Sequence, residues 1–138
     1  MKTIMVSALL LGMCLSGLAQ KDAPEAAKKN FASLYPKVTN VKWGKEGVNY
    51  EAEFKDGTVP TSLLYDAKGT LLETEVGLNV TQLPQAVRDY IAKNLAGSKI
   101  KEAAMIKTAK GETKYEAEIS GKDYLFDASG KLLSVEKE

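Results

Sequence analysis

The chain has 138 residues, 19 of them basic and 18 acidic, and its formal net charge is +1. This balance argues against a nucleic-acid partner, because nucleic-acid binders usually carry a basic surplus that neutralises phosphates. The sequence contains no histidine, which is the commonest general base and zinc ligand of enzymes. Since it also lacks phosphate-loop, metal-ligand and nucleophile motifs, we expect a protein that is not an enzyme and uses no cofactor or metal.

Residues 1–19 have the form of a signal peptide. Lys2 precedes an apolar run over residues 4–15, and Gly17-Leu18-Ala19 supplies the small residues of a cleavage site. The run is shorter than the roughly 20 apolar residues of a membrane-spanning helix. We therefore expect export and no membrane insertion after cleavage. The alternatives are an uncleaved anchor and a lipoprotein acylated at Cys14, which the bulky Met13 disfavours.

The first predicted element of the mature chain is an amphipathic helix over residues 23–35. Ala27 and Phe31 lie four residues apart on its apolar face. Asp22 and Glu25 have the spacing of a capping box, in which side chains satisfy the first backbone N–H groups. The sequence therefore predicts a helix that begins close to the cleavage site.

After this helix the hydrophobic period changes to two, as in a half-buried strand. In residues 48–54, Tyr50 and Ala52 share one face, whereas Glu51 and Glu53 share the other. One apolar face and one polar face indicate an antiparallel sheet that is covered on one side only. Strands are expected near residues 40–45, 48–54, 58–65, 70–76, 100–108, 113–119, 123–126 and 131–135.

The second half of the chain repeats the first at a spacing of about 60 residues, which indicates duplicated supersecondary units. Tyr50–Phe54 returns as Tyr115–Ile119, and a second helix is expected over residues 83–95. The prediction is an α+β fold with one domain over residues 20–138, made of repeats at about 22–78 and 80–138. Each repeat consists of one helix followed by four strands.

Two turns of the repeat carry an aspartate and a glycine three residues apart, Asp66 with Gly69 and Asp127 with Gly130. The aspartate is expected to cap a type I turn, and the glycine to take the left-handed position. These segments also resemble fragments of a calcium loop. They lack its alternating oxygen ligands and terminal glutamate, so turn capping is the favoured interpretation.

The candidate functional residues lie on the polar sheet face: Glu51, Glu53, Glu116 and Glu118, with Trp43 beside them. Four carboxylates on an exposed face could meet a basic patch of a partner or bind a cation. The alternative is a solvated face on which lysines neutralise the glutamates across the strands. Trp43 is expected either at the edge of the core or as an interface anchor.

The set of motifs resembles the PepSY-like, beta-lactamase-inhibitor-like (BLIP-like) proteins of Bacteroidetes. The likeness rests on Leu34-Tyr35-Pro36, Val41-Lys42-Trp43, Tyr50–Phe54, Tyr65–Gly69 and Tyr115–Glu118, and it spans the mature chain. It implies one curved antiparallel sheet with two helices packed on one face, location in the periplasm and no catalytic activity. In beta-lactamase inhibitor protein the concave sheet face grips an enzyme. That inhibitor's disulfides have no counterpart here, because the single Cys14 lies in the leader.

We therefore expect a periplasmic binding module that recognises a protein or peptide through the exposed sheet face, in the manner of an inhibitor or regulator. The alternative is a small-ligand or cation binder that uses the strand carboxylates. A monomer or weak dimer is expected in either case.

Overall fold

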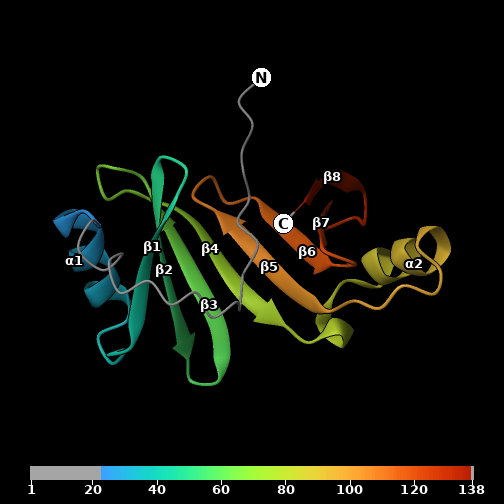
Figure 1. Cartoon of the computed structure of the whole chain (residues 1–138), viewed down its shortest axis with the longest axis horizontal. Coiled ribbons are helices and arrows are strands. Elements are labelled where there is room, and N and C mark those ends of the chain that lie inside the picture. The colour runs from blue at the N-terminus through green and yellow to red at the C-terminus, as the bar shows by residue number, and fades with distance from the viewer. Residues whose placement is uncertain (1–22, 138) are drawn as a thin grey trace. The chain divides into compact units, whose positions relative to one another are not determined.

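The computed structural model describes residues 23–137; the predicted signal peptide and Asp22 lie outside this range. These residues form two α-helices, one short 3-10 helix and eight strands (Figure 1). The strands follow chain order in one eight-stranded sheet, so the predicted α+β fold with tandem helix-plus-four-strand units is confirmed. The elements are α1 (Glu25–Leu34), β1 (Val41–Glu46), β2 (Asn49–Asp56), β3 (Val59–Tyr65), β4 (Leu71–Leu78), the 3-10 helix (Val80–Gln82), α2 (Gln85–Asn94), β5 (Glu102–Thr108), β6 (Thr113–Glu118), β7 (Lys122–Asp127) and β8 (Leu132–Lys137).

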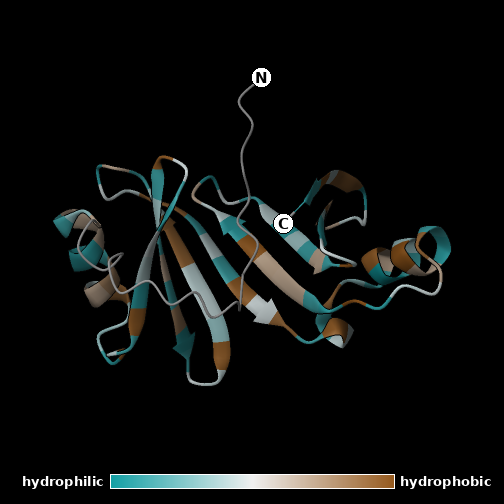
Figure 2. Ribbon diagram, in the orientation of Figure 1, coloured by the Kyte–Doolittle hydropathy of each residue, from teal (hydrophilic) through white to brown (hydrophobic). Residues whose placement is uncertain are grey.

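The chain divides into two compact units between Thr74 and Glu75, inside β4. Unit 1 contains α1 with β1–β3, and unit 2 contains α2 with β5–β8. In both units, hydrophilic and hydrophobic residues succeed one another along the strands (Figure 2). Each unit is described by itself below.

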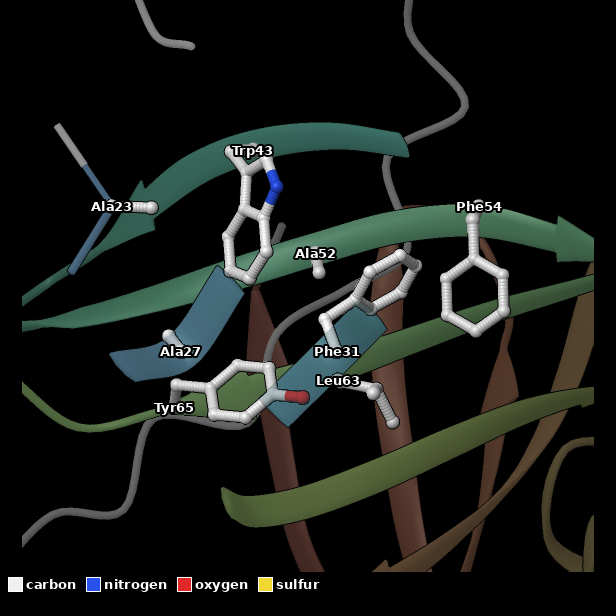
Figure 3. Packing of buried hydrophobic residues seen from close by; sticks show 8 residues of the cluster. All are labelled: Ala23, Ala27, Phe31, Trp43, Ala52, Phe54, Leu63 and Tyr65. Carbon is white, nitrogen blue, oxygen red and sulfur yellow. The ribbon is translucent and has the colours of Figure 1, made fainter. Parts of the chain in front are cut away.

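The core of unit 1 lies between α1 and one face of its strands. Phe31 of α1 packs edge-on against Trp43 at 5.8 Å and Phe54 at 5.0 Å between ring centroids. The strand register pairs Trp43 with Ala52 and Ala52 with Leu63, so these side chains point to the same face. Figure 3 shows them gathered around the helix. Burial of this aromatic cluster is what holds α1 on the sheet.

The core of unit 2 repeats this arrangement with smaller side chains. Val87 and Ile91 of α2 are buried in one cluster with Ala117 and Phe126 of the strands. Tyr90 packs edge-on against Phe126 at 5.3 Å between ring centroids. Val87, Tyr90 and Ile91 therefore lie on the core-facing side of α2.

Both predicted helices are shorter than expected and begin differently. Pro24 is the N-cap residue of α1 and forms no side-chain capping bond, whereas Asp22 of the predicted capping box lies outside the described residues. Glu25 instead lies 3.7 Å from the ammonium of Lys28. Pro84 takes the same position before α2. Proline suits this place because it has a fixed φ and the helix start needs no N–H donor there.

The aspartate turns are confirmed in both units. Asp127 Oδ1 accepts hydrogen bonds from the backbone N–H groups of Ser129 at 2.9 Å and Lys131 at 3.0 Å. Gly130 has a φ of +85°, and a Cβ atom there would lie 2.6 Å from the Cβ of Ala86 in α2. In unit 1, Asp66 caps its turn in the same way. The turn is therefore tight against the helix, and its carboxylate is engaged by backbone rather than free for calcium.

The hairpins differ in length between the units. In unit 1 the β2–β3 pairing continues to Asp56 opposite Val59. In unit 2 the β6–β7 pairing stops at Glu118 opposite Asp123. Ser120, with a φ of +54°, then forms the tight turn with the following glycine.

Candidate functional site

The sheet face opposite α1 carries the first pair of candidate glutamates. Glu51 and Glu53 alternate with the buried Ala52, so they point away from the helix. Glu53 lies opposite Lys42 on β1 and Ser62 on β3, and its Oε2 is 3.7 Å from the Lys42 ammonium. This is the cross-strand lysine neutralisation that the sequence offered as an alternative to a binding role.

Glu51 has a more apolar setting on the same face. It lies opposite Gly44 on one side and Leu64 on the other. Burial raises its pKa to about 7, and the charge of Glu53 adds to the rise, whereas a hydrogen bond with Ser62 opposes it. The two glutamates of unit 1 therefore differ in their electrostatic surroundings, because only Glu53 has a lysine directly opposite.

The sheet face opposite α2 holds a row of four acidic residues, one from each of four consecutive strands. Glu118 of β6 lies opposite Glu102 of β5 and Asp123 of β7, and Asp123 lies opposite Glu136 of β8. We call these four residues the carboxylate row. Neighbouring strands are about 4.8 Å apart, so like charges are held close together. Glu116 lies on the same face, two residues before Glu118.

The prediction that Glu116 and Glu118 are exposed is wrong, because their side chains are only 5% and 4% exposed. Their neighbours explain the difference. Glu116 lies between Ala104 of β5 and Leu125 of β7, both of which are buried. The alternation within β6 correctly separates the two faces. It does not reveal that apolar residues on adjacent strands flank the glutamates.

The electrostatics of the carboxylate row are dominated by burial and mutual repulsion. Burial raises the pKa of Glu116 to about 8, and the charges of Asp123, Glu136, Glu118 and Glu102 raise it further, in that order. Lys101 supplies a cation, since its Nζ lies 2.8 Å from Glu118 Oε1. Glu116 therefore holds a proton more tightly than an ordinary glutamate.

Trp43 does not belong to this surface. Its side chain is 4% exposed and lies on the helix-covered face, where Figure 3 shows it above Ala27 and near Tyr65. Its pairing with Ala52 places it on the face opposite Glu51 and Glu53. The interface-anchor hypothesis for Trp43 is therefore wrong, and the core interpretation is confirmed.

Three members of the carboxylate row, Glu102, Asp123 and Glu136, were not predicted as site residues. Alternation within their strands does not single them out, because Glu102 shares its face with Ala104 and Ile106, and Asp123 shares its face with Leu125. Aligning the repeats would have indicated the place of Asp123. Ser62 lies opposite Glu53 in unit 1, and its counterpart Asp123 lies opposite Glu118 in unit 2. The row itself depends on strand register, which a single strand does not encode.

The described residues offer little for metal coordination or membrane insertion. Within residues 23–137, no three Asp, Glu, His or Cys side chains are grouped so that they could hold a metal ion. None of the helices in this range is long and apolar enough to cross a membrane. The acidic residues of unit 2 are thus spread along a row rather than gathered around one point.

The fold and the face define a class of protein: tandem helix-plus-four-strand units that carry carboxylates on the sheet side opposite the helix. A family model described as "Putative beta-lactamase-inhibitor-like, PepSY-like" matches residues 16–73 and 48–134. The chain belongs to this PepSY-like family, as its motifs predicted. No protein with a curated description matches it.

Solved structures from Bacteroides share the fold. A protein of B. eggerthii described as a "putative periplasmic" protein has a TM-score of 0.74 at 15% identity, over 83% of this chain and 88% of that one. A DUF2874 family protein of B. uniformis has a TM-score of 0.73 at 18% identity, over 83% and 89%. A BLIP-like protein of B. fragilis has a TM-score of 0.65 at 24% identity, over 83% and 86%.

Proposed function

We propose that the protein is an exported, non-catalytic binding module that recognises a protein or peptide in the periplasm. The sheet face opposite the helices is the recognition surface. The observation that carries the proposal is that each unit uses one sheet face to bury its helix and carries carboxylates on the other, partly exposed at Glu51 and Glu53 in unit 1 and nearly buried at Glu116 and Glu118 in unit 2. The description of one structural relative as BLIP-like supports this use of a sheet, by analogy of fold.

Two features support a role without catalysis. The sequence has no histidine, and its single cysteine, Cys14, lies in the predicted leader. The acidic residues Asp66 and Asp127 have their carboxylate oxygens engaged by backbone N–H groups of their own turns. Of the sheet carboxylates, Glu116 and Glu118 are nearly buried, which leaves them little access to a substrate.

A cation binder that uses the strand carboxylates is the second candidate function. The grouping of four acidic residues in unit 2 speaks for it. Calcium takes six to eight oxygen ligands around one centre, however, and no group of three ligands occurs in residues 23–137. The protein or peptide partner is therefore the better-supported function.

The proposal can be tested with tagged mature chain, residues 20–138, used as bait in periplasmic extract. A captured partner would be purified and its Kd measured with wild-type protein and with the Glu51→Lys, Glu53→Lys double variant. These two positions tolerate reversal because both are only partly buried. Reversal at Glu116 or Glu118 would bury an ammonium and unfold the protein instead.

The control is Glu112→Lys, a single reversal with half the charge change of the double variant, at an exposed turn outside the sheet face. We expect the double variant to weaken binding at least about tenfold, as loss of complementary charge does at interfaces, and the control to have little effect. Equal Kd values for the wild type and the double variant would exclude this face of unit 1 as a recognition surface. A melting temperature that rises with calcium but with no protein partner would favour the cation binder.

A further inference from the structure

The two units place different charges at equivalent positions of the same register. In unit 1 the row through Glu53 has Lys42 on one side and Ser62 on the other. In unit 2 the row through Glu118 has Glu102 and Asp123 at these places, and β8 adds Glu136. Unit 1 therefore carries its own cation directly opposite the glutamate. Unit 2 has the carboxylate of Glu102 at the place of that lysine, and its cation comes from the adjacent Lys101.

A buried carboxylate beside this row lacks a partner. Glu116 is 5% exposed, and within residues 23–137 no donor forms a hydrogen bond with its Oε2. A buried acceptor without a partner costs about 1–3 kcal/mol, and more when it is charged. The four row residues all act on Glu116 electrostatically, so its carboxylate belongs to the same cluster. This buried oxygen is therefore available to accept a hydrogen bond from a donor outside residues 23–137.

The cluster can be reached by a cation on a long side chain. Lys101 demonstrates this, because its side chain is 66% exposed and yet its ammonium lies 2.8 Å from the nearly buried Glu118. Glu102 and Glu136, at the two ends of the row, are only partly buried. A cationic group can therefore approach the row from solvent at its two ends, where Glu102 and Glu136 are partly exposed.

We propose that the carboxylate row and Glu116 of unit 2 form a binding site for an arginine side chain of a protein or peptide partner. This inference rests on the proposed function and specifies the group that is recognised. A guanidinium fits better than a metal ion, because its five N–H donors fan out in a plane and can bond carboxylates on neighbouring strands. A metal ion would need those oxygens gathered around one point, which they are not.

Binding of a cation should release a proton at neutral pH. The groups that face Glu116 are Glu102 from β5, Glu118 from its own strand, Asp123 from β7 and Glu136 from β8. Lys101 lies against Glu118, and Lys114 lies two residues before Glu116 on β6, opposite Asp127. Since Glu116 has a pKa of about 8, it is mostly protonated at pH 7, and an arriving guanidinium would favour its ionised form.

The experiment is isothermal titration calorimetry of the mature chain with a capped tetra-arginine peptide at pH 7. The matched ligand control is a tetra-citrulline peptide, which has the same shape without the charge, and calcium chloride alone is a separate titration. Each titration is run in PIPES and in Tris, because the heat of proton release differs between the two buffers. We expect saturable binding of tetra-arginine with proton release, and none of tetra-citrulline.

Three variants locate the site. Glu116→Gln should raise the Kd for tetra-arginine at least about tenfold and abolish proton release, as truncating a buried charge partner does. The repeat-equivalent Glu51→Gln should change the Kd less than about twofold. Glu102→Lys copies Lys42 of unit 1 into the row and should block the peptide while leaving the protein folded.

The outcomes separate this inference from the proposed function. Absence of tetra-arginine binding, or equal binding by Glu116→Gln and wild type, overturns the arginine site. Binding of calcium alone through Glu116 overturns it in favour of a metal. If a purified partner binds wild type and Glu116→Gln equally but not the Glu51, Glu53 double reversal, the proposed function stands and the arginine site fails. If no partner and no peptide bind, both fail.

Discussion

Replacing Gly130 with alanine tests how the aspartate turn of unit 2 is packed on α2. A Cβ atom at this position would lie 2.6 Å from Ala86 Cβ and 2.8 Å from the Ala86 carbonyl carbon. Since backbone atoms of a helix cannot rotate away, α2 or the turn has to shift, at a cost of about 1–3 kcal/mol. The φ of +85° adds about 1–2 kcal/mol for an L-residue. The expected loss is therefore about 2–5 kcal/mol in the free energy of unfolding.

The matched control is Gly121→Ala, in the turn between β6 and β7. Gly121 has a φ of +70°, but no atom of residues 23–137 lies within 4 Å of a Cβ built there. This variant should lose only the backbone contribution of about 1–2 kcal/mol. Urea unfolding followed by circular dichroism gives both values, provided that the m-value is unchanged. If Gly130→Ala is no more destabilising than Gly121→Ala, the close packing of turn and helix is refuted.

Three further predictions concern titration, turn capping and the core. Because Glu116 has a raised pKa of about 8, against 4.5 for an ordinary glutamate, its contribution to stability is present below about pH 4.5 and is lost as pH rises through 8. Glu116→Gln should therefore have about the same free energy of unfolding as wild type at pH 5. At pH 9 its free energy of unfolding should be higher than that of wild type by an amount on the order of 4 kcal/mol. Urea unfolding curves that show the same difference between variant and wild type at both pH values would contradict this. Asp127→Ala should lower the melting temperature at pH 7, because it removes the acceptor of two backbone hydrogen bonds. These bonds hold the Asp127 pKa below its usual value, so the difference in melting temperature between wild type and variant should shrink in acid, where Asp127 of the wild type is protonated. A difference that persists in acid would refute the capping role. Trp43→Ala should lower the free energy of unfolding by about 3–5 kcal/mol, because Trp43 is buried. Strong quenching of the wild-type tryptophan fluorescence by acrylamide would show that Trp43 is not buried.

Much of the fold is encoded locally and could be predicted. The alternation Tyr50, Ala52, Phe54 against Glu51 and Glu53 separates the two sheet faces, and the structure keeps that separation. The repeat supplied the number of elements, because similar segments fold into similar units. The start of α1 was less predictable, since Pro24 and Asp22 both fit a helix start and only backbone geometry selects between them.

The candidate site was predicted only in part. Glu116 and Glu118 were found from one strand, but their burial depends on Ala104 and Leu125 from the strands on either side. Trp43 was placed with the charged residues because its sequence neighbours are polar. Its pairing with Ala52 turns it toward Phe31 instead.

By itself, the sequence determined the repeated units and the alternation that separates Glu51 and Glu53 from the apolar face of their strand. These are local or additive properties, since alternation needs only residues i and i+2. The tertiary structure alone decided which side chains from different strands meet. It brought Glu102, Glu118, Asp123 and Glu136 into one row and left Glu116 buried beside it. Register and burial arise from contacts between distant segments, and for this reason the charge of the site became visible only in the folded protein.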